Sequence, residues 1–249
     1  MALLTGPEIA RQVGLGGVTI DPFDPARLGP NSYDLTLAPE LLVYGKNYPR
    51  HLAHEVSAAC RQDPGKMIRY AGAVPLDMAA EEPTVALTIP PTGLVLWPGV
   101  LYLGATAERA GADDFVPRID GRSSAGRLGL SVHITAGLGD VGFKDRWTLE
   151  ITVVVPLRVY AGARICQVTF ETVAGEPRPY RGQYAGQTGP RPSGLWRDFA
   201  AGPIPAAEPP PGCPGCAALR AVALQCADRL ADCSEILGRL AERKDRRPT

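Results

Sequence analysis

The sequence predicts a mainly β protein, and two observations support that prediction. The chain of 249 residues contains 28 glycines and 25 prolines, a proportion that favours many turns and short strands over a helical bundle. From residue 94 onward, apolar and polar residues alternate with a period of two, as they do in strands that bury one face. Short strands separated by glycine-rich turns indicate an antiparallel sandwich or barrel.

Three segments show the alternation most clearly, and we predict strands over 130–135, 147–155 and 165–171. The second segment places apolar residues from Trp147 to Val155 on one side and Thr148, Glu150 and Thr152 on the other. Each of these strands therefore has one face for the core and one polar face that is open to a cleft or to solvent.

The N-terminus predicts a short helix from Thr5 to Val13, with Thr5 as its cap and Glu8 as the partner in a capping box. Further on, residues 84–107 contain no charged side chain, which is long enough to suggest a membrane span. Three prolines and several glycines would break such a helix, so we predict two short buried strands with a turn at Pro98–Gly99 and a soluble protein.

Composition divides the chain into a main domain at 1–199, a Pro/Ala-rich linker at 200–216 and an amphipathic helical tail at 217–249. Residues 46–82 show no clear period and are expected to form an irregular insertion. The apolar stripe of the tail recurs every seven residues and needs a partner. We expect the tail to pack on the main domain, to self-associate or to recruit another protein.

The charge balance limits the classes of ligand. Lys and Arg number 26, and so do Asp and Glu, so no overall positive field attracts nucleic acid or an anionic membrane. Any phosphate binding must therefore come from a local group of residues. Six cysteines are too few for a disulfide scaffold, and no signal peptide is evident, so we expect a reduced, cytoplasmic protein.

The densest polar cluster is Gly121-Arg122-Ser123-Ser124. A flexible backbone, a guanidinium fork and two hydroxyls are the parts that grip phosphate oxygens. The alternative is a turn with an exposed arginine and two capping serines. Arg127 follows closely, and its neighbours Leu128 and Leu130 are expected to draw it inward, where it would need an anionic or carbonyl partner.

Two carboxylates complete the candidate chemistry. Glu150 is either an ordinary solvent-facing residue or, if a cleft forms on its face, a partly desolvated carboxylate that makes a better general base. Asp140 lies in a glycine-rich turn, where it either caps the turn or meets a ligand that approaches the backbone closely.

Taken together, these segments resemble the dCTP deaminase branch of the trimeric dUTPase superfamily. The resemblance spans about residues 1–199 and follows the family's order of motifs, with a Thr-Ala-Gly form at 135–137 that looks most like the bifunctional dCTP deaminase/dUTPase enzymes. The matching segments are Pro30–Leu35, Leu96–Gly99, Leu103–Glu108, Asp120–Leu130, Val132–Gly137, Asp140–Phe143, Thr148–Ile151, Arg164–Phe170 and Gln183–Ser193.

The resemblance implies a distorted β-barrel or jelly-roll of the dUTPase type, assembled as a homotrimer with active sites between subunits. In such a site Glu150 would be the general base that takes a proton from the water attacking C4 of cytosine. Arg127 and Ser123 would orient that water. The product would be dUTP, or dUMP and pyrophosphate if the triphosphate is also cleaved.

The same resemblance assigns the substrate contacts. Arg122, Ser123 and Ser124 of a neighbouring subunit would hold the triphosphate with its Mg²⁺, and no zinc is required. Other residues would bind the sugar, base and phosphates: Asp140 at the 3′-hydroxyl, Tyr180 and Gln187 from a closing C-terminal segment, and Thr135, Ala136 and Gln183. Gln183 stands where the family often has a phosphate-binding lysine, so further phosphate affinity would come from Arg181 or Arg191.

Other readings remain open. A zinc deaminase needs His-x-Glu or Cys-x-Glu before Pro-Cys-x-x-Cys, and Cys213-Pro-Gly-Cys216 has no such context. Cys226 and Cys233 lie on the apolar stripe of the tail, which favours packing over metal binding. The alternatives to a deaminase are a dUTP diphosphatase without deaminase activity and a non-catalytic nucleotide-binding scaffold that recruits a partner through its tail.

Overall fold

We describe a computed structural model in which residues 2–45, 76–200 and 202 are placed. The chain divides into two units, residues 1–200 and 201–249, and the fold below is that of the first unit. The predicted helical tail, almost all of the linker and most of the predicted insertion at 46–82 lie outside the described residues. Cys213, Cys216, Cys226 and Cys233 lie there too, so the expectations for them stay predictions.

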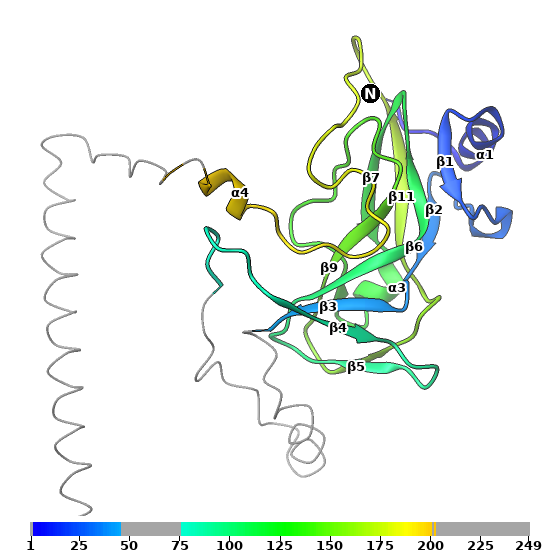
Figure 1. Cartoon of the computed structure of the whole chain (residues 1–249). Helices are drawn as coiled ribbons and strands as arrows, with labels where there is room; N and C mark the ends of the chain where they lie inside the picture. Colours follow the sequence, from blue (N-terminus) through cyan, green and yellow to red (C-terminus); the bar gives the residue numbers. More distant parts are fainter. Residues whose placement is uncertain (1, 46–75, 201, 203–249) are drawn as a thin grey trace, which may run out of the picture. The chain divides into compact units, whose positions relative to one another are not determined.

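Strands dominate the described residues, so the predicted mainly β class is confirmed (Figure 1). The strands are β1 (Val18–Asp21), β2 (Tyr33–Thr36), β3 (Glu40–Tyr44), β4 (Thr84–Thr88), β5 (Leu94–Leu96), β6 (Tyr102–Ala112), β7 (Phe115–Gly121), β8 (Leu130–Ser131), β9 (Arg146–Val153), β10 (Leu157–Val159) and β11 (Arg164–Thr172). The helical elements are α1 (Gly6–Leu15), the 3₁₀ turn η1 (Pro25–Arg27), α3 (Ser123–Gly126) and α4 (Trp196–Phe199).

The described strands pair antiparallel in three sheets, none of which closes on itself. The largest has the order β4-β3-β6-β9-β8, with β1 also paired to β6. A second sheet has the order β2-β11-β7, and β10 pairs with β5 in a third. Their inner faces share one apolar core, and every second residue of β9 from Trp147 onward is buried in it.

The N-terminal helix is confirmed, but its capping box is wrong. Thr5 is the cap residue and makes no side-chain hydrogen bond to the first turn. Glu8 instead accepts hydrogen bonds from Arg11 and from Gln12 within the helix. These two donors lower the pKa of the Glu8 carboxyl to about 2, and the side chain binds within the helix and does not form the predicted capping box.

The structure corrects three strand predictions. The uncharged stretch 84–107 contains β4, β5 and the start of β6, where we predicted two strands. The strand predicted over 130–135 ends at Ser131, and Ile134 is 60% exposed. The strand predicted over 147–155 runs from Arg146 to Val153, after which Val154 and Val155 face outward. None of the helices in the described ranges combines the length and apolar composition needed to cross a bilayer.

Candidate active site

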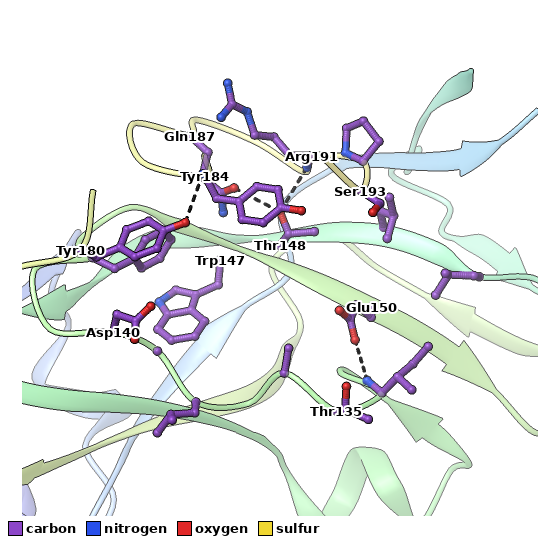
Figure 2. Close-up of a pocket in the computed structure, with 18 of the residues that line it drawn as sticks. Thr135, Asp140, Trp147, Thr148, Glu150, Tyr180, Tyr184, Gln187, Arg191 and Ser193 are labelled. Carbon is purple, nitrogen blue, oxygen red and sulfur yellow. Dashed lines mark hydrogen bonds between the residues drawn. The ribbon is translucent and has the colours of Figure 1, made fainter. Parts of the chain in front are cut away.

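A cavity of about 480 Å³ opens on the polar face of β9 (Figure 2). Most of its lining comes from three segments: β9 itself, the loop from Ile134 to Phe143, and a closing segment that we define as residues 180–194. Its lining residues are Tyr44, Leu101, Leu103, Ile134, Thr135, Ala136, Leu138, Gly139, Asp140, Phe143, Trp147, Thr148, Glu150, Tyr180, Tyr184, Gln187, Arg191, Pro192 and Ser193. Six of the residues assigned from sequence are therefore together: Thr135, Ala136, Asp140, Glu150, Tyr180 and Gln187.

Glu150 lies in the middle of β9, where the strand pairing sets it opposite Leu103 of β6. The alternation of β9 turns its side chain away from the core and into the cavity, so the side chain is partly buried. The backbone N–H of Ile134 donates to Glu150 Oε2 at 2.8 Å. This bond holds the carboxylate beside Thr135 and Ala136, which line the same cavity.

The loop that carries Asp140 is shaped by its glycines, but for a different reason from the one we expected. A side chain at Gly139 would meet the Trp147 ring at 2.2 Å, and one at Gly137 would meet the Ile119 carbonyl oxygen at 2.7 Å. The glycines therefore let the loop pack closely against its own chain. As a result, Asp140 stands exposed at the edge of the cavity with Trp147 as the floor beside it.

Hydrogen bonds hold the closing segment over the cavity. At its start, the N–H of Tyr180 donates to the Val141 carbonyl at 2.7 Å, and the Tyr180 ring meets Phe143 edge-on. In its middle, the buried Gln187 donates through Nε2 to the carbonyl of Arg146, which belongs to β9. The segment thus docks on the strand that supplies Glu150.

The second half of the closing segment is tied by side-chain hydroxyls. The N–H of Arg191 donates to Thr148 Oγ1 at 3.1 Å, and the N–H of Ser193 donates to the Tyr44 hydroxyl at 3.0 Å. The Tyr184 hydroxyl accepts from the N–H of Gly194 at 3.0 Å. The three hydroxyls belong to residues that line the cavity, so the same side chains shape the cavity and hold the backbone of the closing segment.

Sequence reasoning missed several of these residues as parts of the site: Tyr44, Trp147, Tyr184 and Ser193. Tyr44 ends an apolar run on β3, and nothing in that run indicates that its hydroxyl meets a segment almost 150 positions later. Tyr184 and Ser193 fall within the closing segment that the motif pattern identified, so their position could have been a signal.

The Arg122–Arg127 loop does not line this cavity. In the same subunit the Arg122 guanidinium pairs with Asp34 at 2.9 Å and donates to the carbonyl of Arg164. Ser123 and Ser124 open α3 and are exposed. The expectation that Arg127 turns inward is wrong: Arg127 is exposed and Leu128 is 60% exposed, because α3 presents this turn to the outside.

Gln183 also lies outside the cavity lining. Its side-chain Oε1 accepts a hydrogen bond from Arg197, and its carbonyl accepts one from the Arg191 guanidinium at 2.8 Å. Of the two arginines considered for phosphate affinity, Arg191 lines the cavity and Arg181 does not.

The sequence of this chain is similar to those of known proteins. The family model for dCTP deaminase-like domains matches residues 3–173. The chain belongs to this family. A protein of Leptospira biflexa named "dCTP deaminase, dUMP-forming" is 45% identical over 198 residues, which cover 79% of this chain and 98% of that protein. Proteins of the same name from Hathewaya histolytica and Clostridium beijerinckii are 41% and 40% identical over the same share of this chain, covering 99% and 98% of those proteins.

A solved structure also matches. The crystal structure of 2′-deoxycytidine 5′-triphosphate deaminase from Agrobacterium tumefaciens superposes with a TM-score of 0.47 at 19% identity, covering 69% of this chain and 48% of that chain.

Proposed function

We propose that this protein deaminates dCTP and continues to dUMP, as the names of its relatives state for them. The observation that carries the proposal is the placement of Glu150. Its carboxylate projects from β9 into a cavity and is held there by one backbone N–H. A carboxylate fixed in this way is available to accept a proton from a bound water.

In the first step, Glu150 takes a proton from water as the oxygen attacks C4 of cytosine. The tetrahedral adduct collapses when the amino group leaves as ammonia, after receiving the proton through Glu150. Polar groups that already point at the adduct lower its free energy, because they need not reorient as charge develops. In the second step, another water cleaves the bond between the α- and β-phosphates, which yields dUMP and pyrophosphate.

The sugar end of the substrate is expected at Asp140 and Tyr180. Asp140 is exposed at the rim and can accept a hydrogen bond from the 3′-hydroxyl of the sugar. Tyr180 offers a ring face that Phe143 fixes from the side. Gln187, held by β9, would face the phosphates.

Mg²⁺ belongs to this proposal as a companion of the triphosphate. In the described ranges, no group of three or more His, Cys, Asp or Glu side chains gathers to hold a metal. In this proposal the ion takes its ligands mainly from phosphate oxygens and water, which is the common mode for Mg²⁺. When bound, the ion would neutralise charge on the phosphate chain during its cleavage.

We also propose a homotrimer with sites between subunits. The exposed Ser123, Ser124 and Arg127 do not line the cavity of their own subunit, so they serve a site only if they reach the cavity of a neighbour. The same region exposes apolar side chains that a partner would cover: Leu128, Val154 and Val155. A cytoplasmic location completes the proposal, since the substrate is a nucleotide of the cell interior.

The test is a product analysis. Purified protein is incubated with dCTP and Mg²⁺, or with dUTP and Mg²⁺, and the nucleotides are separated by chromatography over time. The proposal expects dCTP to yield dUMP and ammonia. Accumulation of dUTP restricts the activity to deamination, and consumption of dUTP alone indicates a diphosphatase. No turnover of either nucleotide refutes an enzymatic role and favours a nucleotide-binding scaffold.

A further inference from the structure

A second hollow of about 460 Å³ adjoins the cavity. It is lined by Arg109, Asp145, Arg146, Gln187 and Thr188, and we call it the arginine hollow. Gln187 lines both the cavity and the arginine hollow, so the two spaces meet around this one buried side chain. Nothing in the motif pattern or the expected chemistry of the site uses either arginine.

The geometry of β9 relates the two spaces. Arg146, Thr148 and Glu150 lie on the same face of the strand, because side chains alternate with a period of two. Glu150 lies four positions after Arg146, which corresponds to about 13 Å along an extended strand. An extended nucleoside triphosphate spans a comparable length from its base to its phosphate chain. A nucleotide that has its base at Glu150 and lies along β9 toward the start of the strand would bring its phosphates to the level of Arg146.

The charge of the lining residues changes from negative in the cavity to positive in the arginine hollow. The cavity is lined by two carboxylates, Asp140 and Glu150, and by one arginine, Arg191, whose guanidinium is held by the carbonyl of Gln183. The arginine hollow is lined by two guanidinium groups and one carboxylate. A nucleoside triphosphate has an uncharged base at one end and several negative charges at the other, so its charge distribution complements this pair of spaces.

Neither arginine of the hollow is tightly neutralised. Arg109 stands 3.9 Å from Asp145, at the outer limit of an ion pair, and the Asp145 carboxylate already accepts from the N–H of Gly186 at 2.7 Å. Arg146 pairs with no carboxylate in the described ranges, and its Nη1 donates to the Thr188 carbonyl at 3.3 Å. A guanidinium has five N–H donors, so both groups keep donors for phosphate oxygens.

We propose that the arginine hollow receives the phosphate chain of the substrate, with Arg146 and Arg109 as phosphate-binding residues. This inference rests on the proposed function and specifies how that site takes a triphosphate. The side chain of Gln183, which stands where the family often has a phosphate-binding lysine, is uncharged and accepts a hydrogen bond from Arg197. These two arginines supply the positive charge that position 183 does not, in addition to the contacts expected from Arg122 of a neighbouring subunit.

The experiment measures binding in a variant that does not turn over. In a Glu150→Gln background with Mg²⁺, calorimetry gives Kd for dCTP and for dCMP, which share base and sugar and differ in the phosphate chain. Arg146→Gln and Arg109→Gln are each added. Arg158→Gln is the matched control, because Arg158 also donates to a backbone carbonyl at 3.3 Å but lies on β10, outside both spaces.

We expect each hollow variant to weaken dCTP binding about 10- to 100-fold, the loss of a charge-assisted hydrogen bond, with dCMP little changed. The control should leave both constants unchanged. Equal losses for dCTP and dCMP would mean that Arg146 only holds the closing segment through Thr188, and would overturn the inference. Unchanged dCTP binding would also overturn it.

A further comparison separates this inference from the proposed function. If the unaltered protein consumes dCTP normally while the Arg146 and Arg109 variants bind it normally, the arginine hollow is refuted and the enzyme remains. If the unaltered protein neither binds nor consumes dCTP, both fail together. Thermal unfolding of each variant shows whether a loss of binding reflects a loss of folded protein.

Discussion

Replacing Glu150 by glutamine changes the proposed base with little change of shape. In the described residues, the carboxylate accepts one hydrogen bond, from the N–H of Ile134 to Oε2 at 2.8 Å. The amide oxygen of glutamine can accept the same bond, so the loop at 134–137 should keep its position. The stability cost is therefore at most that of one weakened hydrogen bond, about 1 kcal/mol.

The catalytic cost should be much larger. An amide cannot take a proton from water, and a positioned general base contributes about 10²- to 10⁴-fold to a rate. This range equals about 3–5 kcal/mol of the activation free energy. We therefore expect kcat for deamination to fall by about 10²- to 10⁴-fold while the Kd for dCTP changes little.

Single-turnover reactions with dCTP, followed by chromatography and ammonia release, measure this directly. Glu171→Gln is the matched control: it is also a glutamate on a strand, β11, and its partner Arg118 is 3.8 Å away. The control should keep full activity. A Glu150→Gln enzyme that retains more than about a tenth of its rate would show that the carboxylate is not the base.

Three further results are expected. Tyr44→Phe removes the hydroxyl that accepts from the N–H of Ser193, so steady-state kinetics should show KM for dCTP raised roughly fivefold with kcat less affected, and an unchanged KM would mean that this bond does not hold the closing segment. Gly139→Ala places a methyl group 2.2 Å from the Trp147 ring, so denaturant unfolding should show a loss of about 1–3 kcal/mol, and no loss would contradict the close packing of the loop. Cys166 is fully buried, and burial raises the pKa of its thiol, so peptide mass spectrometry should find it unmodified by iodoacetamide at pH 8 until the protein is unfolded; modification in the native state would contradict the core assignment.

Much of the candidate site could be found from the sequence because its residues lie within short, ordered motifs. Glu150 follows from a strand whose apolar residues must face the core, which leaves the carboxylate on the other side. Asp140 was singled out by its glycine-rich turn and Tyr180 through the family resemblance, and the structure places both at the cavity. Arg127 was misjudged because an apolar neighbour predicts burial only if the local backbone faces the core, and α3 faces outward.

By itself, the sequence determined the local pattern: a mainly β chain, an N-terminal helix, and strands such as β9 and β11 whose alternation assigns each side chain to a face. Only the tertiary structure decided which faces meet. Tyr44 and Ser193, or Gln187 and Arg146, come together because hydrogen bonds between distant segments depend on strand register and loop packing, which leave no periodic trace in the chain. The same long-range packing brought the two arginines of β6 and β9 to the edge of the cavity, where charge and distance give them a use that no local motif reveals.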